Sequence, residues 1–316
     1  MEITSEIANK IKLLNEKYAE MGQDLNSYLD GLLHADFLTY WDYVQVDTLL
    51  SLQHPRTPFP DEKIFILYHQ ITELYFNLSL HELEQISNLK DAITIDFFIA
   101  RMKRVNRYFE ALTFSFDVMI EGMEQEQFLK YRMSLLPASG FQSAQYRMIE
   151  IYATNFLNLV AKDKREELRN ETISTQFENI YWKSGATELA TGKKTLTLLQ
   201  FEKKYQQKLI DLASNLVSKN IYSVYNSLSD VDKEAAKNVM RNFDVNVNIN
   251  WPLCHYKSAV RYLQRSPEDI AATGGTNWQK YLPPRFQKRI FYPELWTEAE
   301  HENWGKAWVE LNVFNK

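Results

Sequence analysis

His69 lies in a predicted long helix that carries apolar side chains on both faces, so both faces need cover, and an imidazole in such a place can do chemistry. It lies in DEKIFILYHQITELYFNLSLHEL, residues 61–83, one helical turn after Phe65 and one turn before Glu73, so the three side chains share a stripe. The histidine is either a core residue whose nitrogens find partners or a working group in a pocket. The residues of this stretch leave both interpretations open.

His255 is a second histidine on the apolar face of a predicted helix, in WPLCHYKSAVRYLQ, residues 251–264. Its stripe continues through Ser258, Ala259 and Tyr262, and the residues one turn on from the histidine are small. A flat and bulky group could therefore lie against this stripe.

Arg132 stands four residues after Phe128, so the two side chains lie on one face of a predicted helix. The arginine is either a solvated charge or a group that binds an anion. Ser139 and Gln142 follow with the spacing of a capping box, at the start of the next predicted helix. That spacing gives Ser139 a structural task, whatever else it does.

Two further stretches have both an ordinary and a functional interpretation. Tyr40 and Tyr43 lie one turn apart in LTYWDYV, where the aromatic side chains either simply pack or contribute to a site. Residues 273–276, TGGT, pair two glycines in a chain that has only nine. Such a pair suits a plain turn or a loop that closes over a ligand.

Composition and missing motifs exclude several classes of protein. The net charge of −5 is spread along the chain, which sets up no field for nucleic acid. Cys254 is the only cysteine, so neither an intrachain disulfide nor a thiolate cluster can form. P-loop, GxGxxG, GxSxG and HExxH motifs do not occur. Since neither a leader segment nor an apolar run long enough for a bilayer is found, we expect a cytoplasmic protein without a membrane partner.

The elements that position these residues are helices, because helical periodicity dominates the chain and glycine is scarce. We predict one all-α domain over residues 1–316. Residues 54–60, HPRTPFP, cannot form a regular helix, and Pro252 suits the first turn of the helix that carries His255. Predicted helices cover residues 1–33 with a break near Gly22, 38–53, 61–83, 92–121, a pair joined at Pro137, 195–220, 230–243 and 251–264.

Taken together, the residues resemble the tryptophan 2,3-dioxygenase family over two blocks. The block at 40–152 carries YxxY with VDTLLSLQ, then DEKIFILYHQITELYF and FLKYRMSLLPASGFQSAQYR. The block at 251–296 carries the helix around His255, then TGGT and FYPEL. FIxxHQxxEL together with GFQSxQYR is a specific signature.

The resemblance implies an all-α homotetramer that binds heme b. It also implies that O2 is inserted across the indole C2–C3 bond of L-tryptophan to give N-formylkynurenine, the first step of tryptophan degradation by the kynurenine pathway. By motif, His255 is expected to be the proximal ligand of the heme iron and His69 the distal histidine that faces the indole nitrogen. Arg132 is expected to hold the substrate carboxylate, and Thr273 to lie near the ammonium group.

The resemblance also implies the remaining substrate-binding residues. Phe65 and Phe128 match the walls of the indole pocket, and Ser139 matches a serine at its edge. Tyr40, Tyr43 and Val44 match a segment that reaches into a neighbouring subunit, so we expect the arm formed by residues 1–45 to pack there.

Other functions fit the same residues. If both His69 and His255 bound the iron, the protein would be a six-coordinate heme electron carrier or sensor. The chain could also be a family relative that acts on a modified indole, or a helical protein that shares the fold without heme.

Overall fold

The computed structural model describes residues 3–89, 92–135, 137–187, 192–263, 283–284 and 288–306. The chain divides into two compact units, Met1–His54 and Pro55–Lys316, and each is considered by itself. Helices make up the regular structure of the described residues, in which only two isolated β-bridges occur. The predicted all-α fold class is therefore confirmed.

The unit 1–54 consists of four helices whose side chains are mostly exposed to solvent. Thr4 and Asp24 cap the first two helices by accepting backbone N–H bonds. Gly22 has a φ of 68° and ends the first helix, which confirms the predicted break, because glycine adopts this left-handed conformation without strain. The helices are α1 (Ser5–Glu20), α2 (Leu25–Leu33), α3 (Tyr40–Val44) and α4 (Val46–Leu50).

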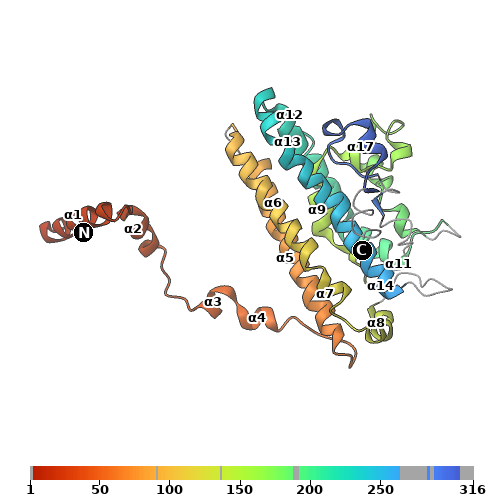
Figure 1. Ribbon diagram of the computed structural model, residues 1–316, viewed down its shortest axis with the longest axis horizontal. Coiled ribbons are helices and arrows are strands. Elements are labelled where there is room, and N and C mark those ends of the chain that lie inside the picture. The colour runs from red at the N-terminus through yellow and green to blue at the C-terminus, as the bar shows by residue number, and fades with distance from the viewer. Residues whose placement is uncertain are drawn as a thin grey trace. The chain divides into compact units, whose positions relative to one another are not determined.

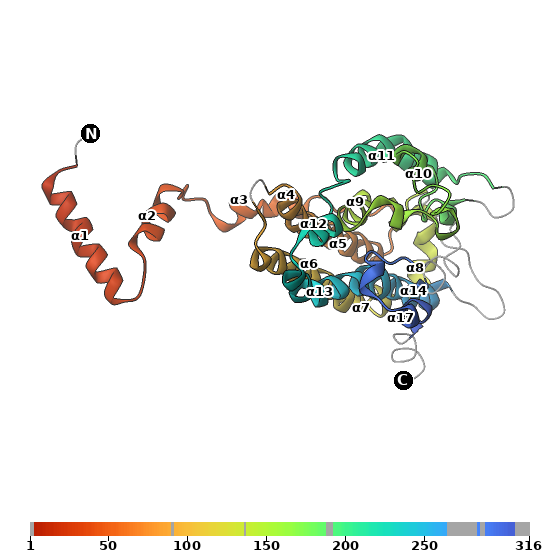
Figure 2. The ribbon, with the colours of Figure 1, turned by 90° about the horizontal axis from the view of Figure 1, so that it is seen from above.

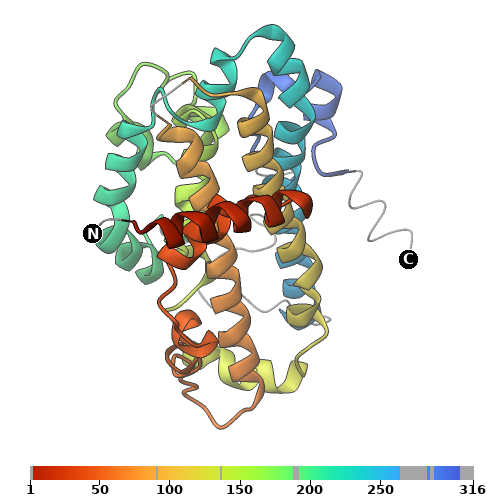
Figure 3. The same ribbon diagram turned by 90° about the vertical axis from the view of Figure 1, so that its left-hand side faces the viewer.

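The unit 55–316 is built around one long helix, α5 (Asp61–Ser87), which packs against α6 (Ile95–Ser115) and α9 (Ala144–Ala153) (Figures 1 and 2). In turn, α13 (Asp230–Val245) packs along α6 (Figure 3). The other elements are α7 (Asp117–Ile120), α8 (Gln125–Tyr131), η1 (Arg132–Leu135), η2 (Gly140–Gln142), η3 (Phe156–Leu159), η4 (Lys162–Lys164), α10 (Ile173–Glu178), η5 (Ser184–Ala186), α11 (Leu196–Asn215), α12 (Ile221–Ser227), η6 (Asn246–Asn250), α14 (Trp251–Leu263), η7 (Pro293–Leu295) and α17 (Glu298–Glu302). No helix among the described residues is both long and apolar enough to cross a bilayer.

The start of α5 is fixed by the carboxylate of Glu62, which folds back onto the proline-rich segment before the helix. Its oxygens accept the backbone N–H groups of Arg56 and Thr57 at 2.9 and 2.8 Å. Residues 54–60 therefore stay out of the helix, as the prolines predict.

The two apolar faces of α5 have different surroundings. Phe76 and Leu83 belong to the buried face. On the other face, Ile71, Leu74 and Leu78 remain exposed, Leu74 by 53%. The sequence predicts cover on both faces, but the described part of the chain leaves Ile71, Leu74 and Leu78 exposed.

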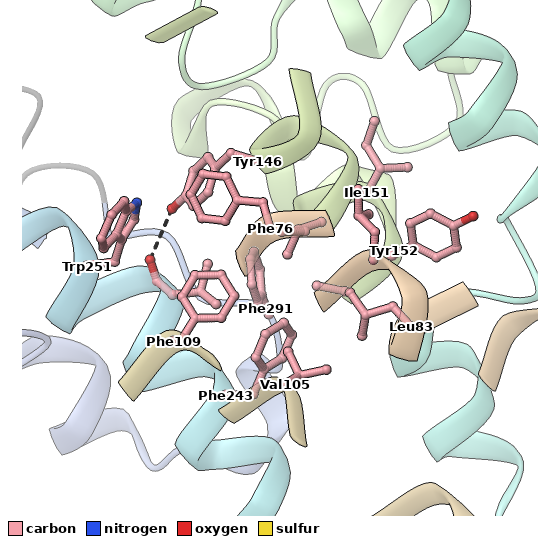
Figure 4. Packing of buried hydrophobic residues seen from close by; sticks show 14 of the residues in the cluster. Phe76, Leu83, Val105, Phe109, Tyr146, Ile151, Tyr152, Phe243, Trp251 and Phe291 are labelled. Carbon is pink, nitrogen blue, oxygen red and sulfur yellow. Dashed lines mark hydrogen bonds between the residues drawn. The ribbon is translucent and has the colours of Figure 1, made fainter. Parts of the chain in front are cut away.

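Phe76 lies at the centre of an aromatic core (Figure 4). Its ring centroid is 6.0 Å from that of Phe109 on α6, 5.4 Å from that of Tyr146 on α9 and 5.7 Å from that of Trp251 on α14. Four helices therefore meet at this ring, and the core fixes α14 relative to α5.

α13 and α14 form one uninterrupted helical rod, because the π-helical turn η6 joins them directly. Pro252 therefore lies in the first turn of α14, as predicted, but α14 continues directly from α13 and is not a separate helix.

Asp244, near the end of α13, anchors the chain segment that runs past η7. Its carboxylate accepts the backbone N–H groups of Phe291 and Tyr292 at 2.9 and 3.2 Å, and the indole N–H of Trp296 at 2.9 Å. The side-chain amide of Asn248 donates a fourth hydrogen bond at 2.6 Å. These bonds hold the FYPEL motif against the rod that carries His255.

Candidate functional site at two neighbouring histidines

His255 on α14 is held in one tautomer by its own helix. Its Nδ1 lies 3.0 Å from the carbonyl oxygen of Trp251, and because a carbonyl only accepts, Nδ1 carries the proton. Nε2 is then left with a lone pair, and no group in the described part of the chain hydrogen-bonds to it. The rings of Trp251 and Phe116 flank the imidazole, with centroids at 4.5 and 4.6 Å.

His69 on α5 has the same arrangement. Its Nδ1 donates to the carbonyl oxygen of Phe65 at 2.7 Å, and the Phe65 ring lies 4.1 Å from the imidazole. Its Nε2 likewise has no hydrogen-bond partner among the residues that the structure describes.

Both imidazoles are neutral at physiological pH. Desolvation lowers the pKa of His69. Burial lowers the pKa of His255 to about 4, and a smaller contribution comes from the nearby His69, which disfavours a second positive charge. The two helices therefore bring together two neutral imidazoles, each with Nε2 available as an acceptor or a metal ligand.

Phe128 extends this site from α5 to α8 and α14. Its ring lies 6.4 Å from the ring of Phe65 and 4.8 Å from that of Tyr262, and the Tyr131 ring lies 5.6 Å away. Tyr262 is fixed because its hydroxyl donates to the carbonyl oxygens of Ile120 and Met123. The result is an aromatic wall that begins beside His69.

Arg132 follows Phe128 by one turn, at the junction of α8 and η1. The side chain is buried, and desolvation lowers the pKa of the guanidinium. The starting pKa is so high that the group stays charged. Arg132 thus brings a positive charge and a planar set of N–H donors close to the aromatic wall.

Ser139 forms the predicted capping box. Its Oγ accepts the N–H of Phe141 at 3.4 Å, and its own N–H donates to the Gln142 side chain at 3.2 Å. The box starts η2 and not the long helix α9, whose N-cap is Ser143. The spacing was therefore interpreted correctly, but the helix assigned to it was wrong.

The remaining candidates lie elsewhere or are not described. Tyr40, Tyr43 and Val44 belong to the unit 1–54 and are exposed there, Tyr43 by 77%. Thr273 and the rest of TGGT lie outside the described residues.

Comparison with known proteins decides the family. A sequence profile described as tryptophan 2,3-dioxygenase matches residues 32–251, more than two thirds of the chain. The chain belongs to the tryptophan 2,3-dioxygenase family.

Individual relatives agree with this assignment. A tryptophan 2,3-dioxygenase of Bacillus anthracis is 29% identical over 283 residues, which cover 84% of this chain and 94% of that protein. One from Anaeromyxobacter dehalogenans (strain 2CP-C) is 29% identical over 269 residues, covering 84% and 97%. The protein of that name from Ruegeria sp. (strain TM1040) is 40% identical over 122 residues, but these cover only 38% of this chain and 43% of that protein.

In this member of the tryptophan 2,3-dioxygenase family, the structure brings together Phe65, His69, Phe128 and His255, four of the residues that the sequence singles out. Arg132, a fifth, follows Phe128 by one helical turn, and its backbone N–H donates to the Phe128 carbonyl oxygen. The residues that orient His255 were not predicted from the sequence. Trp251 could have been found, because it precedes the histidine by one turn. Phe116 could not, since it comes from a distant part of the chain.

Signature residues of the tryptophan 2,3-dioxygenase family also bind the helices to one another. The Gln145 side chain donates to the Glu73 carboxylate at 2.7 Å and to the Glu73 carbonyl at 2.9 Å. These contacts join α9 to α5 one turn beyond His69. Glu73 is therefore a structural partner, which its position in the stripe of His69 did not reveal.

Proposed function

We propose that the protein is a heme-dependent dioxygenase that inserts both atoms of O2 across the indole C2–C3 bond of L-tryptophan and yields N-formylkynurenine. One observation carries the proposal within the family. His69 and His255 are both neutral, close to each other, and free at Nε2 beside an aromatic wall and a buried arginine.

The residues fit a heme b held through a single imidazole. His255 is the proposed proximal ligand, because its Nδ1–H is fixed by the Trp251 carbonyl and its Nε2 carries the lone pair that iron needs. Ala259, one turn on, is small enough to leave space for a macrocycle. When bound, heme supplies the iron that activates dioxygen.

The protein's own side chains bind and orient the substrate in this proposal. Arg132 pairs with the tryptophan carboxylate through two parallel N–H···O bonds. Phe65 and Phe128 pack against the indole ring, and the neutral Nε2 of His69 accepts a hydrogen bond from the indole N–H. The substrate is then fixed at both ends, which positions C2 and C3 for attack.

Two further proposed contacts complete the substrate site. Ser139 lies at the pocket edge, where its hydroxyl can still donate while its oxygen serves the capping box. Thr273 is assigned to the ammonium group through the family resemblance alone.

We also propose that the protein is a cytoplasmic homotetramer in which residues 1–45 pack on a neighbouring subunit and bring Tyr40, Tyr43 and Val44 to its site. Two exposed apolar surfaces support this assembly. The unit 1–54 exposes Tyr40, Trp41 and Tyr43, and α5 exposes Leu74 and its neighbours. Burial against a symmetric copy would remove such side chains from water.

The direct test is product formation in ¹⁸O2 by purified, reduced, heme-loaded protein. We expect N-formylkynurenine from L-tryptophan with two ¹⁸O atoms in each molecule. A product with one ¹⁸O atom, or no product at all, would overturn the proposal. A six-coordinate ferrous spectrum without substrate would favour the electron carrier in which both histidines bind iron.

A further inference from the structure

The π-helical turn before His255 contains a backbone acceptor that has lost its regular donor. The N–H of Trp251 donates to the carbonyl oxygen of Asn246, five residues earlier. In the same register, the next donor would be residue 252 and its acceptor Val247. Residue 252 is a proline, which has no N–H. Because Val247 is fully buried, its carbonyl oxygen needs another donor.

Two side chains from distant parts of the chain supply that donor. The Tyr146 hydroxyl donates to the Val247 carbonyl oxygen at 3.1 Å, and Nη2 of Arg289 donates to the same oxygen at 3.1 Å. Nη2 of Arg289 also donates to the Tyr146 hydroxyl at 2.8 Å. Figure 4 shows Tyr146 directed toward the part of the rod that carries Trp251, with its hydrogen bond drawn as a dashed line.

These two donors are held by a buried network of charges and amides. Glu150 pairs with Nη1 of Arg289 at 2.5 Å, and with Arg147 at 3.0 Å through its other oxygen. Nε of Arg289 donates to the side-chain oxygen of Asn248, which lies inside η6. Glu150 is fully buried, so its negative charge and the positive charge of Arg289 depend on their pairing with each other. The network therefore grips the turn at Val247 and at Asn248.

The turn leads directly into the residues that fix His255. Trp251 begins α14, and its carbonyl oxygen accepts Nδ1–H of His255. We propose that Tyr146 and Arg289 are positioning residues for His255, because they hold the Val247 carbonyl that Pro252 leaves without a backbone donor and so fix the turn that orients the imidazole. The claim about the turn stands on the contacts alone, whereas its effect on iron rests on the proposed function.

The test compares Tyr146→Phe with Tyr225→Phe in the full-length chain. Tyr225 is a matched control, because it is also buried and its hydroxyl also donates to a carbonyl oxygen, that of Lys233 at the other end of α13. Hydrogen exchange of residues 246–255 in the heme-free protein reports on the turn. Heme affinity and the Fe–N(imidazole) stretching band of the ferrous protein report on His255.

We expect Tyr146→Phe to speed exchange in the turn, shift the stretching band and weaken heme binding by roughly 10- to 100-fold, the usual effect of losing a group that orients a metal ligand. Tyr225→Phe should change none of these, although it loses the same kind of hydrogen bond. Arg289→Lys keeps the charge beside Glu150 but removes the planar donor set, and it should act like Tyr146→Phe.

A rescue experiment separates positioning from general stability. Pro252→Ala gives residue 252 an N–H that can reach the Val247 carbonyl oxygen, so adding Tyr146→Phe to that variant should weaken heme binding less than threefold. If Tyr146→Phe lowers stability but leaves the band and the heme affinity unchanged, the positioning role is wrong. If the wild-type protein binds no heme, the proposed function fails. Separately, if hydrogen exchange of residues 246–255 is unchanged in Tyr146→Phe, Tyr146 does not hold the π-helical turn.

Discussion

The carbonyl oxygen of Trp251 accepts Nδ1–H of His255 at 3.0 Å, so the residue one turn earlier on α14 sets the tautomer of the imidazole. In the proposed function, His255 provides the only bond from the protein to iron. We therefore expect His255→Ala to lose most of its heme, and added imidazole to restore it. His69→Ala should keep its heme. An absorption spectrum of each purified variant measures this, and the reverse pattern would exchange the roles of the two histidines.

Arg132→Ala should weaken tryptophan binding by roughly 10- to 150-fold, because a charge-assisted hydrogen bond contributes about 1.5–3 kcal/mol. Lys130→Ala is the matched control, since Lys130 is a nearby cation whose partner, Glu126, is exposed. Titration of the heme-loaded protein with tryptophan, and with an indole that lacks a carboxylate, separates the two effects. Equal losses for both ligands would show that Arg132 is structural.

Oligomers mixed from two inactive variants should regain activity if sites are shared between subunits. Tyr43→Ala and Arg132→Ala damage different segments of the proposed site, so some sites in a mixed oligomer draw both intact segments from different chains. We expect product formation after the variants are unfolded and refolded together, but not after either is refolded alone. A fully active monomer would be incompatible with this arrangement.

Phe76→Ala should lower the free energy of unfolding by about 3–5 kcal/mol, the usual cost of removing a phenyl ring from a packed core. Phe76 is only 2% exposed and meets rings from three other helices. Phe114→Ala, at a side chain that is 86% exposed, should change stability by less than about 0.5 kcal/mol. Urea unfolding of both variants tests the difference, and similar losses would place the core elsewhere.

Asp244 should make the protein less stable as the pH rises from about 4 to 6. Burial raises the pKa of this carboxyl to about 6, against the opposing effect of four hydrogen bonds. Between the unfolded and folded pKa values, the folded state keeps a proton that the unfolded chain has released, so stability falls with pH. The expected loss is about 3 kcal/mol, since each pKa unit corresponds to about 1.36 kcal/mol.

The measurement compares urea unfolding of the wild-type protein and Asp244→Asn between pH 4 and pH 7. Other carboxyl groups titrate equally in both proteins, so the difference isolates Asp244. Wild-type stability should fall relative to that of the variant. A wild-type advantage that grows with pH would mean that the hydrogen bonds outweigh burial.

Periodicity and signature motifs predicted the family, the all-α fold and most long helices, because a buried face repeats every turn. The break at Gly22 and the non-helical residues 54–60 were also predictable, since glycine and proline act locally. The π-helical turn was not, because its stability comes from Tyr146 and Arg289, which are distant in sequence. The sequence therefore predicted two separate helices, 230–243 and 251–264, where the chain forms one rod.

The candidate site divides in the same way. His69, His255, Phe65, Phe128 and Arg132 were found because each lies in a recognisable motif. The tautomer of each histidine and the ring of Phe116 needed three-dimensional contacts. The exposure of Leu74 on α5 could not be predicted, because the sequence does not show which apolar residues the other helices of the chain leave uncovered.

The π-helical turn also limits how this sequence can change by insertion and deletion. A π turn contains about one residue more than an α-helical turn, and each residue rotates a helix by about 100°. Deleting a single residue from 246–250 could leave a regular helix, yet His255 would then face a different side of the rod. A related sequence with a one-residue gap at this point could therefore keep a folded core but lose the position of this histidine.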